Sequence, residues 1–229
     1  MASPAGTPEE ARRAGLVELV RRAYTAAILR GDERAAERAI RDALDGELGQ
    51  EVIDDEIIAP ALRYVGRLWA EGAITVADEH IATHISLRVL ALQREAFRVA
   101  RDRASQRVLL MAPEGEHHVV GLEMAANLLL HAGFDVRFVG ADVPLEALAP
   151  VVVHHEPRLV AFSVTMPGSA RVLRAAIDEV RRADPGLAVL VGGSGVPEDF
   201  QETEWLGVAR NAATTVETVD ALLRRPSMN

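Results

Sequence analysis

The spacing of apolar residues changes character near the middle of the 229-residue chain. Residues 1–103 carry apolar positions only at the intervals of three and four that mark amphipathic helices. Residues 107–223 instead alternate short runs of β-branched residues with longer amphipathic stretches. We therefore predict two domains, an all-α domain over residues 1–103 and an α/β domain over residues 104–229, with the boundary near residues 101–106.

Capping and breaking signals divide the first domain into four helices. Thr7-Pro8-Glu9-Glu10 offers an N-cap, a proline at the first helical position and a glutamate at the third. Gly31-Asp32 and Asp45-Gly46 interrupt the pattern, and Thr75 with Asp78 resembles a second capping box. The first expected helix ends near Arg30 and the second near Leu44. The third runs from about Val52 to Trp69, and the fourth ends near Asp102. Four helices with short connections favour a four-helix bundle.

The second domain reads as alternating strands and helices. The expected strands cover residues 107–112, 135–140, 159–163, 188–191 and 207–209, and the expected helices cover residues 122–131, 144–155, 169–183 and 215–224. Such alternation predicts a parallel sheet covered on both faces, a Rossmann-like (flavodoxin-like) fold. Ligands of such sheets bind beyond the carboxyl ends of the strands, where the strand order reverses.

Composition narrows the function. The hydrophobic share of 49% and charged share of 26% are those of a globular protein, and we expect a cytoplasmic protein without a membrane partner. Zero cysteines exclude disulfides and thiolate metal sites, so metal chemistry needs histidine, carboxylates or a cofactor that carries its own metal. The net charge of -9 argues against direct binding of nucleic acid, which requires lysine and arginine to displace counterions.

Three loops at the predicted binding edge carry candidate chemistry. They are Glu116-His117-His118-Val119-Val120-Gly121 after the first strand, Ser163-Val164-Thr165 after the third, and Val191-Gly192-Gly193-Ser194-Gly195 after the fourth. Each loop alone is a weak signal, since a histidine before a helix, a Ser-x-Thr N-cap and a glycine turn are all common. No Gly-Lys-Ser/Thr phosphate loop follows a strand, and the dinucleotide Gly-x-Gly-x-x-Gly is missing at the first turn.

Taken together, the three loops resemble the cobalamin-binding domain, whose signature is Asp-x-His-x-x-Gly, then Ser-x-Leu or Ser-x-Thr, then Gly-Gly. Here it reads Glu116-x-His118-x-x-Gly121, Ser163-Val164-Thr165 and Gly192-Gly193, and the segment with Gly140 and Asp142 looks like the family's loop after strand two. The resemblance implies that His118, and not His117, is the lower axial ligand to cobalt. It also implies a base-off cobalamin whose benzimidazole lies in a slot framed by the serine, threonine and glycines, with Glu116 in the place of the usual aspartate.

The first domain carries a second constellation. Trp69 ends the third helix, and Val76, Glu79 and His80 fall on one face of the fourth, at i, i+3 and i+4. Read without the other loops, this set is a core aromatic and a carboxylate at a helix start. Trp69 and Glu79-His80 with nine residues between them nevertheless resemble the Trp-x9-Glu-His signature of the adenosylcobalamin-dependent (CarH-like) photoreceptors. In that family the tryptophan covers the adenosyl group on the upper face of the corrin, the glutamate bonds its ribose, and the histidine lies beside them.

Two departures bear on function. The MerR-type helix-turn-helix of the family's full-length regulators is absent from this sequence, and Ala70 stands where a cobalt-capturing histidine usually follows the tryptophan. The resemblance implies a stand-alone light sensor that is not an enzyme. In it, breakage of the cobalt–carbon bond would change the conformation or assembly of a homo-oligomer, or signal to a separate effector.

Other functions stay open. The main alternative is a corrinoid methyl-carrier serving a methyltransferase. An adenosyl-radical enzyme is a third class, but the chain lacks the substrate barrel that such an enzyme needs. Cobalamin storage or delivery is the fourth. A bilin such as biliverdin is an open second chromophore, and His80 with His84 an open metal pair.

Overall fold

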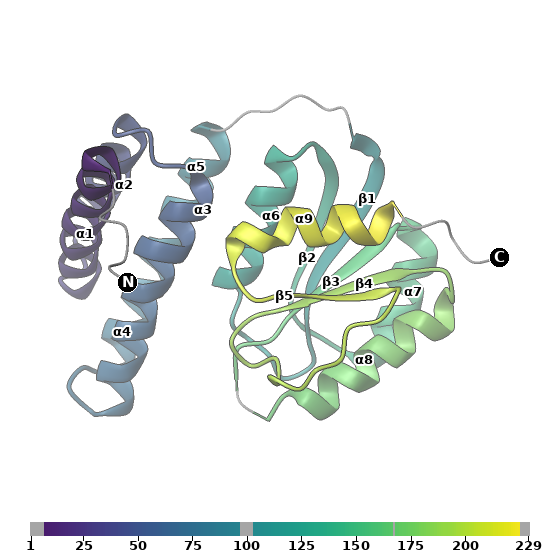
Figure 1. Cartoon of the computed structure of the whole chain (residues 1–229). Coiled ribbons are helices and arrows are strands. Elements are labelled where there is room, and N and C mark those ends of the chain that lie inside the picture. The colour runs from purple at the N-terminus through teal and green to yellow at the C-terminus, as the bar shows by residue number, and fades with distance from the viewer. Residues whose placement is uncertain (1–6, 97–102, 167, 225–229) are drawn as a thin grey trace, which may run out of the picture. The chain divides into compact units, whose positions relative to one another are not determined.

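The computed structural model describes residues 7–96, 103–166 and 168–224. The chain divides into two compact units, residues 1–92 and 93–229, which are coloured from purple to blue and from teal to yellow in Figure 1. The helical first unit and the parallel sheet of the second confirm the predicted fold class. The expected boundary near residues 101–106 overlaps residues 97–102, which lie outside the described ranges, so the limits 1–103 and 104–229 stay a prediction.

Capping side chains start the helices where the sequence predicts them. Thr7 and Glu10 form a reciprocal capping box before α1, and Thr75 pairs in the same way with Asp78 before α5. Asp32 caps α2 through the N–H of Ala35. The helices of this unit are α1 (Pro8–Leu29), α2 (Glu33–Asp45), α3 (Gln50–Val52), the π-helical turn η1 (Ile53–Ile58), α4 (Ala59–Ala70) and α5 (Val76–Ala96).

The expected single helix from Val52 to Trp69 is wrong in its interior, because η1 interrupts it. Pro60 explains the interruption, since a proline inside an α-helix removes a backbone donor and crowds the carbonyl four residues earlier. The N–H of Ala59 instead reaches back five residues to the carbonyl of Asp54. The wider π-turn therefore lets one continuous helical segment pass the proline.

The helical segments pack as a bundle around aliphatic side chains. Tyr24 of α1 is fully buried and donates a hydrogen bond to Ser86 of α5 at 2.9 Å. Arg88 of α5 pairs with Glu33 of α2 at 2.7 Å. The core consists of residues from all the long segments, namely Val20, Ala27, Ile28, Ala36, Ile40, Ile53, Ile57, Ile58, Val65, Ala82 and Val89. Each large aliphatic side chain buried here contributes about 1.5–3 kcal/mol, so packing stabilises the short helices.

The second unit is a five-stranded parallel sheet in the order β2-β1-β3-β4-β5. Its strands are β1 (Arg103–Pro113), β2 (Phe134–Val143), β3 (Leu159–Ser163), β4 (Ala188–Gly192) and β5 (Leu206–Ala209), and its helices are α6 (Val120–His131), α7 (Leu145–His155), α8 (Ala170–Ala183) and α9 (Ala212–Leu223). This order is the flavodoxin-like one, with its reversal between β1 and β3.

Alternate residues of the strands face opposite layers of helices. Leu109, Val160 and Val189 pack in one cluster with α7 and α8. Leu110 and Ala161 pack in another cluster with α6 and α9. Both faces of the sheet are therefore covered, as the apolar strand sequences predict (Figure 1). None of the helices formed by the described residues combines the length and apolarity of a membrane span.

Candidate functional site

Three loops with predicted cofactor residues meet at one edge of the sheet. Parallel strands present their carboxyl ends at the same edge, and β1 and β3 are the neighbours at which the strand order reverses. Glu116 and His118 follow β1, β3 ends at Ser163, and β4 ends at Gly192, which lies in register with Ser163. The structure thus brings together the loops that the sequence motifs indicate.

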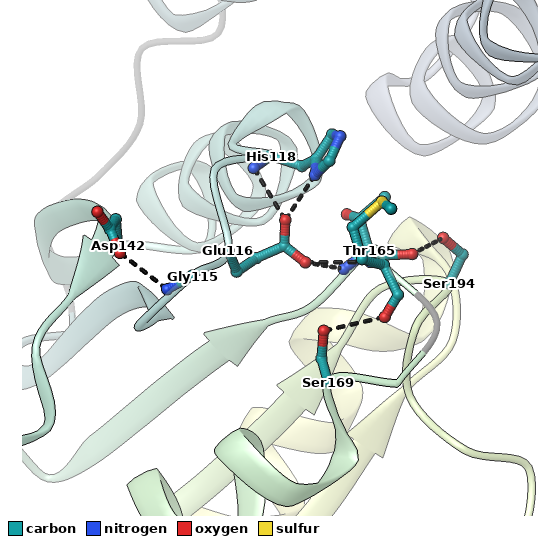
Figure 2. Close-up of polar contacts among 8 residues, drawn as sticks. Gly115, Glu116, His118, Asp142, Thr165, Ser169 and Ser194 are labelled. Carbon is teal, nitrogen blue, oxygen red and sulfur yellow. Dashed lines mark hydrogen bonds and ion pairs between the residues drawn. The ribbon is translucent and has the colours of Figure 1, made fainter. Parts of the chain in front are cut away.

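The side chain of Glu116 ties the loop after β1 to the loop after β3 (Figure 2). It is 2% exposed. Its Oε1 accepts a hydrogen bond from the backbone N–H of His118 at 3.0 Å and lies 2.6 Å from Nδ1 of the same residue. Its Oε2 accepts from the backbone N–H groups of Thr165 at 2.7 Å and Met166 at 3.1 Å. Both carboxylate oxygens are therefore used, and donors from two loops converge on them.

These donors decide the charge of Glu116. Burial by itself raises the pKa of a carboxyl group, because the charged form loses its hydration. The backbone N–H groups of Thr165, His118 and Met166, together with the His118 ring, outweigh burial and hold the pKa of Glu116 below its ordinary value. Glu116 is therefore a buried carboxylate that stays ionised.

The ionised carboxylate orients the His118 ring. A carboxylate only accepts hydrogen bonds, so in the neutral ring the short contact assigns the proton to Nδ1 and leaves Nε2 with a free lone pair. Nε2 has no hydrogen-bond partner among the described residues, and the side chain is 51% exposed. Figure 2 shows the ring standing clear of the strands. A histidine held through one nitrogen by a carboxylate, with the other nitrogen open, is the usual arrangement of a metal-ligating histidine.

Asp142 fixes the start of the same loop. Its Oδ1 accepts a hydrogen bond from Gly115 at 2.8 Å, and its own N–H donates to the carbonyl of Glu116 at 3.0 Å. Asp142 adopts φ 52°, a left-handed conformation that aspartate tolerates better than most residues. Gly140, two residues earlier, has φ 108° at an irregularity in the pairing of β1 with β2. The end of β2 therefore holds the loop that carries Glu116 and His118.

The glycines after β4 let two loops pack backbone to backbone. A Cβ atom on Gly193 would lie 2.1 Å from the carbonyl oxygen of Val164, and one on Gly195 would lie 2.6 Å from that of Met166. Gly195 also donates to the carbonyl of Val164 at 3.0 Å, and Ser194 donates to that of Thr165 at 3.2 Å. The protein's own packing thus requires Gly193. Val164 has its side chain in the sheet core, and its contact with a cofactor stays a prediction.

Gly121 differs from these glycines, because nothing in the protein requires it. A Cβ atom there would meet only Ser163 Oγ, at an ordinary contact distance of 3.7 Å. Ser163 is 6% exposed, and its hydroxyl group has no hydrogen-bond partner in the described part of the chain. Space beside Gly121, a hydroxyl group without a partner among the described residues and the open Nε2 of His118 all fit a bulky group inserted at this edge.

The first-domain candidates lie at the junction of α4 and α5. Trp69 and Val76 are half exposed, at 50% and 52%. Glu79 accepts a hydrogen bond from Thr83 at 2.8 Å, and its other oxygen lies 2.6 Å from Nδ1 of His80. The helical unit thus presents an exposed tryptophan and valine together with a carboxylate oriented by its own helix.

The histidines do not belong to a metal site with three or more protein ligands in the described part of the chain. The residues that the structure describes contain no group of three or more His, Asp or Glu side chains able to hold a metal ion. A metal inside an organic ring would need only one protein ligand, which the edge of the sheet offers in His118.

The family described as "B12 binding domain" matches residues 106–223, more than half of the chain, and a second family with the same description matches residues 20–92. The chain belongs to the B12-binding domain family. The match covers every loop at the edge of the sheet, and it confirms the resemblance drawn from the motifs.

Two curated relatives of this B12-binding protein are repressors from Myxococcus xanthus. The chain is 37% identical to the HTH-type transcriptional repressor CarH over 61% of its own length and 46% of the repressor. It is 31% identical to the repressor CarA over 83% of its length and 62% of that protein. The chain therefore spans about half to three-fifths of the relatives it matches.

A solved structure shares the fold. The monomethylamine corrinoid protein of Methanosarcina barkeri aligns over 90% of this chain and 98% of its own, with a TM-score of 0.73 and 16% identity. The likeness extends over both units of the B12-binding protein.

Sequence reasoning missed the backbone contributors to the site. Met166 N–H and Gly115 N–H act through the main chain, which no residue type reports. Ser194 and Gly195 had a signal, since both belong to the Gly-Gly-Ser-Gly run after β4.

Proposed function

We propose that the protein binds adenosylcobalamin base-off, with His118 as the lower cobalt ligand, and that it senses light. The observation that carries the cofactor assignment is the His118–Glu116 pair, in which Nδ1 is held at 2.6 Å and Nε2 is left open. Bound adenosylcobalamin supplies a cobalt–carbon bond that light can break. The protein residues hold, orient and shield that group.

The sheet unit supplies the lower contacts in this proposal. Glu116 keeps the proton of His118 on Nδ1, so Nε2 offers its lone pair to cobalt. Ser163 and Thr165, with Gly192 and Gly193, frame the benzimidazole, and the space beside Gly121 supports an insertion there.

The helical unit supplies the upper contacts. Trp69 covers the adenosyl group and Val76 adds an apolar contact, which accords with their exposure. Glu79 accepts from the ribose, and His80 orients Glu79. A methyl group on cobalt would use neither the indole nor the carboxylate. The 37% sequence identity with the repressor CarH supports the choice of adenosylcobalamin over methylcobalamin.

Light-driven loss of the adenosyl group would remove the upper contacts and leave the lower ones. A ligand shifts a conformational equilibrium only through its different affinity for the two states, and that loss supplies such a difference. The expected output is a change in self-assembly or in affinity for a separate effector.

A corrinoid methyl-carrier is the second candidate function. The fold likeness to the monomethylamine corrinoid protein favours it. It shares the lower ligand but predicts a small apolar cap, so the two functions differ in their need for Trp69 and Glu79.

Reconstitution in darkness separates the candidates. We expect adenosylcobalamin to bind tightly, and green light to change both the absorbance spectrum and the size-exclusion profile. Failure to bind contradicts the cofactor assignment. Binding without any response to light contradicts the sensor and leaves the carrier.

Matched variants sharpen the experiment. His118→Ala should abolish histidine ligation, whereas His117→Ala, at the exposed neighbouring residue, should not. Trp69→Ala should weaken binding of adenosylcobalamin more than that of methylcobalamin. Tyr64→Ala removes another exposed aromatic side chain of α4 and should affect neither. Equal losses for both cobalamins in Trp69→Ala contradict the upper-face assignment.

A further inference from the structure

A buried acid lies in the π-turn of the helical unit. Asp54 belongs to η1 and is 0% exposed. Its turn packs against α1 on one side and continues into α4 on the other. Helical turns with π geometry are rare and are concentrated at functional sites.

Asp54 has too few partners for a buried charge. The Gln50 side chain donates to its Oδ2 at 3.3 Å, while Asp54 Oδ1 and the side-chain oxygen Oε1 of Gln50 are buried without any hydrogen-bond partner among the described residues. A buried acceptor left without a donor is costly, and a buried charge more so.

The surrounding charges do not compensate. Asp55 and Glu51 are close enough to disfavour ionisation further, and α1 contributes the buried phenol of Tyr24. The arginines of α4, Arg63 and Arg67, are on its exposed side. Burial first, and then these two carboxylates, raise the pKa of Asp54 to about 7 against the hydrogen bond from Gln50.

The neutral acid fits this site better than the carboxylate. A protonated Asp54 could donate to the carbonyl oxygen of Gln50 if the Gln50 amide is turned over, an orientation that heavy-atom positions do not distinguish. The proton would lie between Asp54 Oδ2 and the Gln50 side-chain oxygen, and Oδ1 would remain as the carbonyl oxygen of a neutral acid, which costs less to bury than a carboxylate. The carboxylate has only the single donor and would require water.

The site sits where the helix departs from regular α-helical register, at the π-turn that leads into α4. The π-turn contains one residue more than an α-helical turn, and α4 runs from it without a break to Trp69. Moving a helix by one residue in register turns every later side chain by about 100° around the axis.

We propose that η1 is a proton-gated hinge: neutral Asp54 keeps the turn closed, and ionised Asp54 takes up water, opens the turn and rotates α4 together with Trp69. The hinge needs neither cofactor nor light, so it stands apart from the proposed function. It gives the helical unit two states that differ in the direction of its exposed tryptophan.

Hydrogen exchange of the full chain without cofactor tests the opening. After correction for the intrinsic effect of pH, protection of the η1 and α4 amides should fall by up to about a hundredfold between pH 5 and 8. The reason is that the equilibrium constant for opening rises about tenfold per pH unit between the ordinary pKa of Asp54, 3.8, and its raised pKa of about 7 in the closed turn. Protection in α8, in the other unit, should change much less. Equal pH dependence in both regions overturns the hinge.

Two variants test the acid itself. Asp54→Asn cannot ionise, so its η1 amides should keep the same protection at both pH values. Glu56→Gln changes an exposed carboxylate of the same turn and should behave as the wild type. A pH dependence that persists in Asp54→Asn overturns the proposal. If that variant does not fold, the wild-type comparison of η1 with α8 still decides.

Trp69 reports the rotation. The chain has two tryptophans, so Trp205→Phe leaves Trp69 as the single emitter, and phenylalanine retains a ring beneath Arg181. In that background we expect a shift of emission with a midpoint near pH 7. The shift should be absent after Asp54→Asn and retained after His80→Gln. Loss of the shift in His80→Gln, or its absence in the Trp205→Phe parent, overturns the coupling to α4.

Discussion

Glu116 and Asp54 are both buried carboxyl groups, yet the protein treats them in opposite ways. Glu116 is 2% exposed and receives hydrogen bonds from two loops, whereas Asp54 is 0% exposed and receives one, from a side-chain amide. The pKa of Glu116 is lowered, and burial raises that of Asp54 to about 7. Burial alone therefore does not determine the charge of a carboxyl group.

Backbone geometry explains the difference. Glu116 lies in a loop and faces another loop, where N–H groups are not committed to secondary structure. Asp54 lies within a helical segment, whose N–H groups already bond to carbonyls of the same segment. A loop can supply donors to a buried acid, and a helix interior cannot. The ionised acid serves to orient a histidine, and the poorly bonded acid is suited to a switch.

The largest predicted effect follows from replacing Asp54 by asparagine. The native state holds a proton that the unfolded state has released between about pH 4 and 7, so the wild type loses stability as the pH rises through that window. A pKa raised from 3.8 to about 7 corresponds to about 4 kcal/mol as an upper limit. Asp54→Asn should therefore be comparable to the wild type near pH 4 and more stable by up to that amount above pH 7.

Urea unfolding at several pH values measures this difference, with Trp69 as reporter in the Trp205→Phe background. Asp55→Asn, one residue away and only partly buried, is the matched control. A stability difference that does not vary with pH would show that Asp54 is ionised in the folded protein.

The same acid-to-amide exchange at Glu116 should lower the stability of the protein, whereas at Asp54 it raises the stability. A glutamine offers one carbonyl oxygen, so its NH₂ group must face either the donors of His118 or those of Thr165 and Met166. Unpaired buried donors and lost charge-assisted hydrogen bonds together should cost about 3 kcal/mol at pH 7. Since the lowered pKa of Glu116 stabilises the protein only above its unfolded value, the loss should shrink as the pH falls below about 4.

Glu116→Gln should also disturb His118, the proposed axial ligand. An NH₂ group facing the ring favours a proton on Nε2 of His118, which blocks that nitrogen as a metal ligand. We expect a loss of cobalamin affinity of about tenfold to a hundredfold, measured by absorbance titration. Glu114→Gln, at an exposed residue of the same loop, is the control. Unchanged affinity in Glu116→Gln would contradict the orienting role.

The fold was largely predictable from apolar spacing. The strand Leu159–Ser163 was predicted to the residue, because a buried parallel strand is a short apolar run between polar residues. The π-turn was not predicted, since Val52 to Trp69 has helical spacing throughout and only Pro60 indicates a break. The first residues of β1 were missed because Arg103 is polar. It joins the strand by pairing with Asp220 and packing on Phe134.

The site was predictable in its order along the chain and not in its contacts. Glu116, His118, Ser163 and Gly193 were indicated by motif spacing, and topology places their loops together. That Glu116 bonds to the main chain of Thr165 and Met166 depends on loop conformation, which residue types do not specify. Asp54 was missed because an acid in an amphipathic pattern is ordinarily on the surface.

Asp142 offers a smaller test of how the Glu116 loop is held. Asp142→Ala removes the acceptor of Gly115 N–H and leaves a residue that tolerates φ 52° poorly, so we expect a loss of about 1–2 kcal/mol. Asp142→Asn keeps an acceptor oxygen and accepts that conformation, and should lose less than half as much. Thermal unfolding measures both, and equal losses would mean that the charge of Asp142 matters more than its geometry.

Gly121→Ala should have the smallest effect on stability. It therefore tests the binding of the cofactor separately from the folding of the protein. The added methyl group meets only Ser163 Oγ, at 3.7 Å, and alanine is the better helix former by up to about 1 kcal/mol, so the protein without cofactor should be unchanged or slightly more stable. If the space beside Gly121 receives part of the cofactor, the same methyl group overpacks the complex and should weaken cobalamin binding by about tenfold to a hundredfold. Gly15→Ala makes the same exchange within α1, with nothing within 4 Å, and should leave affinity unchanged. Full affinity in Gly121→Ala would mean that the glycine serves the protein rather than its cofactor, because only a bound group makes that position crowded.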